Sequence, residues 1–187
     1  VNHERRYWKR MLEVSGLCDG LAIERAGLLM TLSTLAKGIA TEKMLEDVWD
    51  IPEQERDAFK QLFRALTPLY PDRQGLQGLR PDLIGEALVA QSLLTERGLS
   101  LLDQILASGA SALRRSSLTV LARLLNDRED LIAVVEEVLT RHFIGCIDDW
   151  IAVCIETTGP LVHLMESIYQ KLPAALQGQA TGILKSR

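Results

Sequence analysis

The stretch from Leu69 to Leu88 constrains the fold of this chain more than any other part of it. Its first portion, LYPDRQGLQGL, contains the Pro, Asp and Gly residues that favour a tight turn between short apolar segments. Its second portion begins at Pro81 and carries acidic residues in its first turn, as a helix start does. The pattern predicts short strands at Leu69–Tyr70 and Leu76–Leu79, followed by a helix.

Helical patterns precede this stretch. Apolar residues recur at intervals of three and four in segments that we expect to be helices: Glu4–Val14, Ile23–Lys37, a short one that Thr41 caps, and a fourth. Asp50 and Glu53 stand at capping-box spacing at the start of the fourth, with Pro52 in its first turn. A set of helices followed by a β-hairpin, or wing, is the outline of a winged helix. We therefore predict a winged-helix-like half with an additional helix at its N-terminus, over residues 1–97.

The remainder of the chain, residues 98–187, has a different pattern. It shows only helical segments of about 10–15 residues joined by short breaks. The expected helices are Leu99–Ser108, Ala110–Leu125, Glu129–Phe143, Ile147–Glu156, Pro160–Leu172 and Pro173–Leu184. Their apolar stripes predict an α-helical, TPR-like repeat array. The expected fold class is thus mainly α, with one short β-hairpin wing.

Composition limits where such a chain could act. A net charge of −4 argues against a broadly nucleic-acid-binding surface, and no apolar run reaches the roughly 18 residues that span a bilayer. Three cysteines, an odd number, indicate reduced thiols rather than a disulfide framework. We expect a cytoplasmic protein without a membrane segment. Because the chain begins with Val and not Met, we also expect a fragment of a longer protein.

Four segments resemble a known family. HERRYW (His3–Trp8), TLSTLAKG (Thr31–Gly38), LYP (Leu69–Pro71) and LRPDLIGEALV (Leu79–Val89) occur in the same order in bacterial STAND-type (NACHT-like) P-loop NTPases. In that family an ATPase module precedes a winged-helix-like segment and helical, often TPR-like, repeats. This chain resembles the part after the ATPase core, over about residues 3–95. The resemblance marks structural or interdomain positions at Trp8, Tyr70, Pro71, Arg80, Pro81, Asp82, Gly85 and Glu86.

The chain departs from that family in one respect. It contains no GxxxxGK[ST] sequence, so it has no phosphate-binding loop. The family's ATPase activity therefore does not transfer to it. The resemblance implies a non-catalytic regulatory module in signalling, without a cofactor. Its partner would be a protein, the ATPase domain in cis.

The densest basic cluster comprises Arg5, Arg6, Lys9 and Arg10. A solvated helix face is the ordinary interpretation of such a cluster. The functional interpretation is contact with an acidic or nucleotide-bearing neighbour. Arg114, Arg115, Arg123 and Arg128 form a looser basic group, for which an ordinary charged surface is again the simpler interpretation.

Duplex DNA is the alternative partner, because winged helices often place a helix in the major groove. The expected helix here begins PEQERDAFKQLFRAL, and its acidic residues offset Arg56, Lys60 and Arg64. This pattern favours a protein partner over DNA. The alternative hypothesis is a winged-helix transcription regulator with a helical effector or dimerisation region.

Catalytic and metal chemistry have weak support. His142 and Cys146 lie four residues apart, with Cys154 and His163 downstream, but these spacings fit no compact zinc site. Asp148 and Asp149 are expected in the first turn of a helix after a break at Gly145, where carboxylates favour the helix dipole. We therefore predict neither a metal nor an enzyme.

Overall fold

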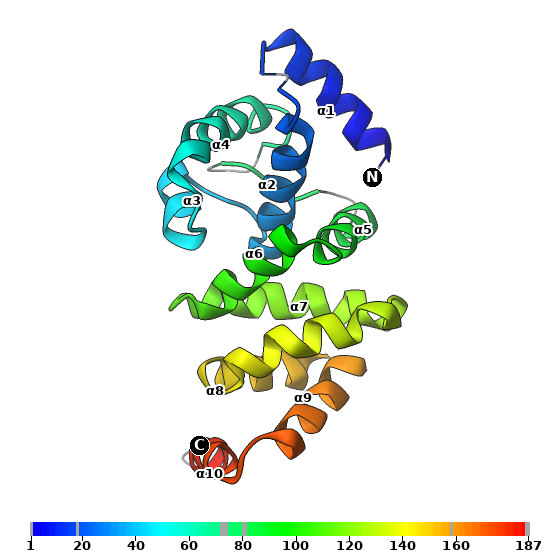
Figure 1. Cartoon of the computed structure of the whole chain (residues 1–187). Helices are drawn as coiled ribbons and strands as arrows, with labels where there is room; N and C mark the ends of the chain where they lie inside the picture. The colour runs from blue at the N-terminus through cyan, green and yellow to red at the C-terminus, as the bar shows by residue number, and fades with distance from the viewer. Residues whose placement is uncertain (1, 18, 72–74, 80–81, 158, 186–187) are drawn as a thin grey trace. The chain divides into compact units, whose positions relative to one another are not determined.

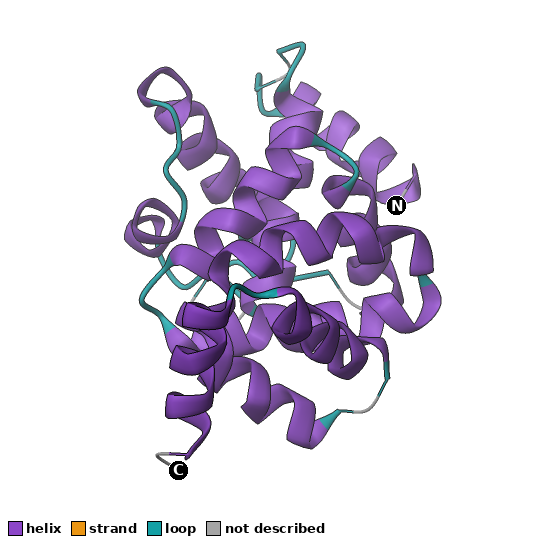
Figure 2. Ribbon diagram, turned by 60° about the horizontal axis from the view of Figure 1, so that its bottom comes forward, coloured by secondary structure: helices purple, strands orange, loops and turns teal. Residues whose placement is uncertain are grey.

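The computed structural model describes residues 2–17, 19–71, 75–79, 82–157 and 159–185. Within these ranges the regular secondary structure is helical and no strand is present (Figures 1 and 2). The chain divides into two compact units, residues 1–104 and 105–187. The mainly α class is confirmed, and none of the described helices is long and apolar enough to cross a membrane.

The first unit is organised around one central helix. Its helices are α1 (Asn2–Val14), α2 (Ala22–Ala36), α3 (Glu42–Val48), α4 (Glu53–Leu66), α5 (Asp82–Leu93) and the first part of α6 (Glu96–Ala107). Helix α2 packs against α1, α4 and α5. Its buried residues lie around nearly the whole circumference of the helix, as expected of a helix that is covered by neighbours on several sides.

Helix α3 begins as local sequence signals predict, whereas α4 begins at Glu53, with Pro52 as its N-cap and without the predicted Asp50 cap. The Thr41 hydroxyl accepts a hydrogen bond from the Met44 N–H at 3.1 Å, so the predicted cap of α3 is confirmed. Phe59 of α4 meets Trp49 edge to face, with ring centroids 4.5 Å apart. The buried residues of α4 are Phe59, Leu62, Phe63 and Leu66, which repeat at helical spacing.

The predicted β-hairpin wing is wrong. Residues 72–74 lie outside the described part of the chain, and the flanking residues form only isolated β-bridges, Ile39 with Leu76 and Pro71 with Leu76. The Leu76 N–H donates to the Ile39 carbonyl at 2.9 Å, and the Ile39 N–H donates back at 2.8 Å. Ser33 Oγ donates to the Leu76 carbonyl at 2.9 Å. The segment therefore pairs mainly with the chain beyond α2, and its pairing with itself is limited to the Pro71–Leu76 bridge and a hydrogen bond from the Gln77 N–H to the Tyr70 carbonyl at 2.8 Å.

The GLQG sequence, residues 75–78, is consequently a packing element. A Cβ at Gly78 would lie 2.8 Å from Thr34 Cα, so only glycine lets this segment approach α2 so closely. Leu76 and Leu79 are buried there. An isolated two-stranded hairpin is at best marginally stable in water. Burial of these leucines against α2 stabilises the packed arrangement more than hairpin pairing would.

The second unit contains the end of α6, α7 (Ser111–Asp127), a 3-10 turn (Glu129–Leu131), α8 (Ile132–Glu156), α9 (Pro160–Lys171) and α10 (Ala174–Lys185). Helix α8 packs on α7, α9 and α10. The predicted break at Gly145 is wrong, because α8 is continuous. Glycine inside a helix costs only about 1 kcal/mol relative to alanine, and burial of Phe143, Cys146 and Trp150 on either side outweighs that cost.

Candidate interaction surface

Helix α1 is held to the first unit by its inner face. Trp8 and Leu12 are fully buried. The Trp8 indole Nε1–H donates to the Tyr70 hydroxyl at 2.9 Å, and the Tyr70 hydroxyl donates to the Glu4 carboxylate. Burial, and then the hydrogen bond to Glu4, raise the pKa of Tyr70, so this phenol stays protonated and keeps its donor.

This hydrogen-bonded set unites two of the segments that carry the family resemblance. Glu4 and Trp8 belong to HERRYW, and Tyr70 belongs to LYP. Sequence reasoning marked Trp8 and Tyr70 but overlooked Glu4. The missed signal is its spacing, because Glu4 lies four residues before Trp8 and therefore on the same helix face.

We expect Tyr70→Phe to destabilise the first unit by about 1–2 kcal/mol. The change removes the hydroxyl and leaves the Trp8 indole and the Glu4 carboxylate without this partner in a half-buried setting. Urea denaturation followed by tryptophan fluorescence measures the effect. Tyr7→Phe is the matched control, since Tyr7 is an exposed tyrosine of α1. Equal midpoints for the two variants would contradict the anchoring role of Tyr70.

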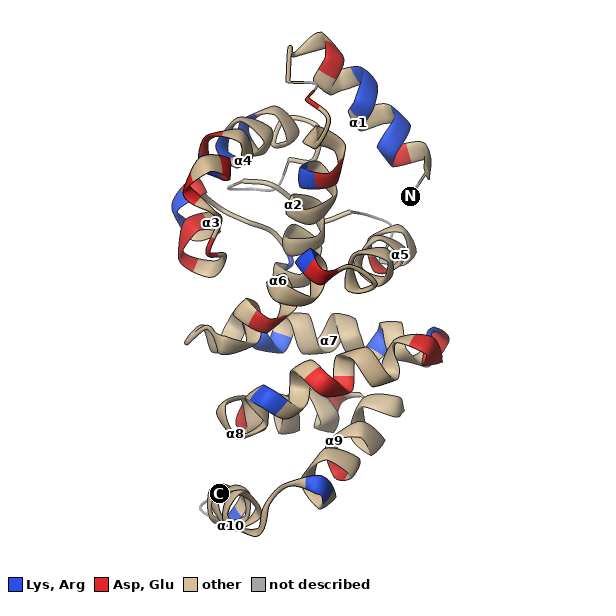
Figure 3. Cartoon of the chain, viewed as in Figure 1, with Lys and Arg blue, Asp and Glu red and all other residues tan. Residues whose placement is uncertain are grey.

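The outer face of α1 is basic. Arg5, Arg6, Lys9 and Arg10 are all exposed, and none has a hydrogen-bond or ion-pair partner in the described part of the chain. Because successive helical residues lie about 100° apart, these cations share an arc of about 140° that excludes Trp8. Figure 3 shows Lys and Arg concentrated along α1. We call these four residues the basic face.

The basic face works against the stability of its own helix. Arg5 with Lys9, and Arg6 with Arg10, are like charges at i, i+4, and each pair costs about 0.2–0.5 kcal/mol. The last turn of α1, where cations would favour the helix dipole, carries none. Local helix energetics therefore do not account for this arrangement.

The cations of α4 are arranged differently. Lys60 Nζ lies 2.7 Å from a Glu46 carboxylate oxygen, and Arg64 Nε lies 2.6 Å from one of Glu42. Both carboxylates belong to α3. The helix expected to approach DNA therefore has two of its three cations neutralised within the first unit. Arg73, a cation of the predicted wing, lies outside the described residues.

Of the remaining positions marked by the resemblance, Asp82, Gly85 and Glu86 belong to α5. Gly85 is buried, and a Cβ there would meet the Thr34 side chain at 2.9 Å, so this glycine lets α5 pack closely on α2. Pro71 is exposed and Glu86 is half-buried. Asp82 begins α5. Arg80 and Pro81 lie outside the described residues.

The residues considered for metal or acid–base chemistry are not brought together. No group of three His, Cys, Asp or Glu side chains in the described ranges could hold a metal ion. Cys146 is buried, donates to the Leu106 carbonyl at 3.3 Å, and has its pKa raised to about 11 by burial. A thiol so protonated is a poor ligand and nucleophile. Cys18 lies outside the described residues.

Asp149 has a structural environment that sequence reasoning missed. It lies in the middle of α8 and not in a first turn, so the expected dipole role is wrong. Its carboxylate accepts from Ser111, from Arg114 Nε at 2.6 Å and from Arg115 Nε at 2.9 Å. Burial acts to raise the pKa of Asp149, but these hydrogen bonds outweigh it and hold the pKa below its ordinary value. Two members of the looser basic group are thereby internally paired.

Comparisons with protein-family models, with curated proteins and with solved structures found no match for this chain.

Proposed function

We propose that this chain is a non-catalytic regulatory and protein-interaction module, and that its contact surface is the basic face of α1. The observation that supports this most is the set of four exposed cations without partners in the described residues. They lie on a helix whose opposite face is anchored through Trp8 and Tyr70. A rigidly held row of cations is pre-organised for an anionic surface, so little side-chain and helix ordering is needed on binding.

The partner we propose is an acidic protein surface. Cations at i, i+4 lie about 6 Å apart along the helix, which matches carboxylates at the same spacing on a partner helix. The segments HERRYW and LYP, which hold α1 in place, resemble those of STAND-type NTPases. We therefore propose an ATPase domain in cis as the acidic partner, within a bacterial signalling protein.

The DNA-binding alternative loses its main structural support. It depended on a wing, and the described residues flanking 72–74 form no strand. It also depended on cations of α4, of which Lys60 and Arg64 already pair with carboxylates of α3. Counterion release, which drives duplex binding, requires cations free to meet phosphates.

Charge reversal on the basic face tests the proposal. We expect Arg6→Glu with Arg10→Glu to weaken binding of a fluorescent helical peptide bearing glutamates at i, i+4 by at least about tenfold. The wild-type affinity should itself fall between about 50 mM and about 300 mM NaCl, since exposed charges are screened. Fluorescence anisotropy measures both effects.

The matched control is Lys43→Glu with Lys185→Glu, which reverses the same number of exposed charges elsewhere. This double variant should bind the acidic peptide as the wild type does. Equal binding by both double variants would refute the proposed surface, and tighter binding to a DNA duplex than to the peptide would refute the proposed partner. The flanking coding sequence tests the cis arrangement, which a P-loop module upstream would support.

A further inference from the structure

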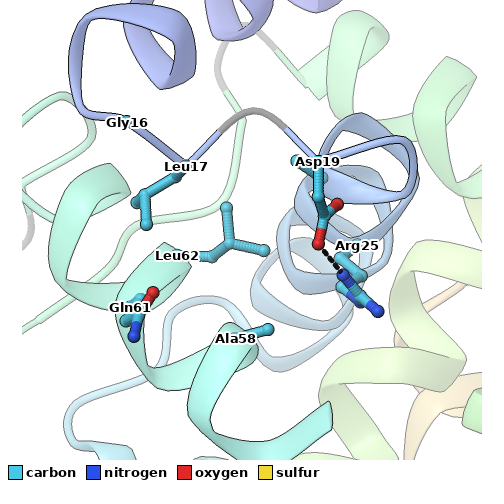
Figure 4. A pocket seen from close by; sticks show the side chains of 8 residues that line it. Gly16, Leu17, Asp19, Arg25, Ala58, Gln61 and Leu62 are labelled. Carbon is cyan, nitrogen blue, oxygen red and sulfur yellow. Dashed lines mark hydrogen bonds and ion pairs between the residues drawn. The ribbon is translucent and has the colours of Figure 1, made fainter.

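A cavity of about 270 Å³ lies in the first unit beside the linker that joins α1 to α2. One part of its wall is apolar, formed by Leu17 of the linker, Ala22 of α2, and Ala58 and Leu62 of α4. Figure 4 shows Leu17 and Leu62 on one side of the hollow, with Asp19 and Arg25 facing them. This volume is close to the lower end of the range for small-ligand sites and ample for an amino-acid side chain.

The backbone of Gly16 and Leu17, on one side of the cavity, is held by the end of α1. Gly16 has a φ of 68°, the left-handed conformation that ends many helices. The Leu17 N–H donates to the Leu12 carbonyl at 2.9 Å, and the Gly16 N–H donates to that of Glu13 at 3.2 Å. These bonds fix the backbone at Leu17, so the cavity has a defined apolar side.

The polar wall belongs to an ion-pair cluster with excess negative charge. Arg25 lies 2.6 Å from Asp19 and 3.5 Å from Glu55, while Arg97 lies 2.5 Å from Glu55 and 3.0 Å from Glu24. Three carboxylates thus share two guanidinium groups. The Arg25 side chain is only 10% exposed, whereas that of Asp19 is 60% exposed. The charge that reaches solvent at the cavity is therefore the Asp19 carboxylate.

Asp19 stays ionised over the physiological range. Its slight burial acts to raise its pKa, but the Leu21 N–H and the Arg25 guanidinium outweigh this and hold the pKa below its ordinary value. An exposed carboxylate beside an apolar wall is complementary to a cation carried on a methylene stem, as lysine side chains are.

We propose that this cavity binds an alkylammonium group, presented either by a lysine side chain of a partner protein or by a free aliphatic amine. The methylene stem packs against Leu17 and Leu62. The ammonium group donates to the Asp19 carboxylate. The Gln61 side chain also lines the cavity. Binding of one cation neutralises the excess negative charge of the ion-pair cluster.

A carboxylate ligand is the competing possibility. The Arg25 Nε is buried without a hydrogen-bond partner in the described residues, and an anion could satisfy it. Against this, the Arg25 guanidinium is already paired with Asp19 and Glu55, and an anion would add to the negative excess. The observations favour the cation, and a carboxylate probe belongs in the test.

The test is a titration of the full chain followed by ¹H–¹⁵N correlation spectra. The probes are N-acetyl-lysine-N-methylamide, its norleucine counterpart, which lacks the ammonium group, and its glutamate counterpart. We expect saturable shifts at the amides of Leu17, Asp19 and Gln61 with the lysine probe alone. Cadaverine separates the two sources: comparable affinity identifies a free amine as sufficient, and weaker affinity identifies a peptide-borne lysine.

Two variants check the assignment. Asp19→Asn keeps an oxygen for the Leu21 N–H but removes the charge, and it should weaken lysine-probe binding at least tenfold. Ala58→Leu fills the cavity, keeps every charge and should abolish binding. Asp47→Asn, an exposed acid of α3, is the control and should bind normally. Equal shifts with the norleucine probe, preferential binding of the glutamate probe, or undiminished binding by Ala58→Leu would overturn the proposal.

Discussion

Asp149→Ala should destabilise the second unit by about 3 kcal/mol. Asp149 is only 2% exposed, and it accepts hydrogen bonds from Ser111, Arg114 and Arg115, which tie the start of α7 to the middle of α8. Loss of one partner from a buried ion pair costs about 3–5 kcal/mol, because the other charge stays buried. The lower figure applies because the Arg115 side chain is half exposed and can turn to water. Chemical denaturation followed by circular dichroism measures the loss.

Glu137→Ala is the control for this prediction, since Glu137 is an exposed carboxylate of the same helix. Asp149→Asn should have an intermediate effect, because its amide oxygen still accepts one donor. The lowered pKa of Asp149 also predicts a pH dependence of stability. The stabilising contribution of Asp149 is present above its unfolded-state pKa, near 3.8, and is lost as the pH falls through its lower folded-state pKa. An Asp149→Ala variant with wild-type stability at neutral pH would contradict the structural role.

Trp8→Ala should release α1 from the first unit and cost about 3–5 kcal/mol. Trp8 is fully buried, and its indole Nε1–H donates to Tyr70, so the change leaves a cavity and an unpaired hydroxyl acceptor together. Inside α1 only Leu12 is buried besides Trp8, so little else holds this helix in place. Hydrogen exchange of the α1 amides, compared with those of α2, measures the release.

Tyr7→Ala is the matched control, because Tyr7 is the neighbouring aromatic residue and is 44% exposed. Its α1 amides should exchange at nearly the wild-type rate. If the α1 amides of Trp8→Ala exchanged as slowly as those of Tyr7→Ala, the inner face of α1 would not be its anchor. The basic face would then not be rigidly presented, and the pre-organisation argument for the proposed surface would fail. The affinity of the Trp8→Ala variant for the acidic peptide connects the anchoring of α1 with the proposed surface. This affinity should fall, although every cation of the basic face remains.

The candidate surface shows how far sequence patterns reach. Arg5, Arg6, Lys9 and Arg10 could be placed on one helix because helical periodicity fixes which residues share a face. The sequence could not reveal that Lys60 and Arg64 are neutralised while the basic face is not, because their partners Glu46 and Glu42 lie on another helix. Ion pairs between helices depend on how the helices pack, and no local sequence pattern indicates that packing.

The two errors in the fold have one physical cause. LYPDRQGLQGL has the turn chemistry of a hairpin, and Gly145 has the local propensity of a helix break. In both places tertiary burial outweighs local preference: Leu76 pairs with Ile39 beyond the end of α2, and the residues around Gly145 bury against neighbouring helices. Local preferences of about 1 kcal/mol cannot oppose the burial of several large apolar side chains.

The sequence by itself determined what depends on neighbours along the chain: the helical class, the cap at Thr41, the buried stripe of α4 and the basic stripe of α1. Periodicity and capping act within a few residues, so they can be recognised in the amino-acid sequence alone. Only the tertiary structure decided what depends on residues distant in sequence: the Glu4–Tyr70–Trp8 anchor, the environment of Asp149, and the cavity between Asp19 and Leu62. Those features arise when helices pack. Burial and ion pairing then decide which distant residues become partners, and the local sequence pattern does not distinguish between the candidates.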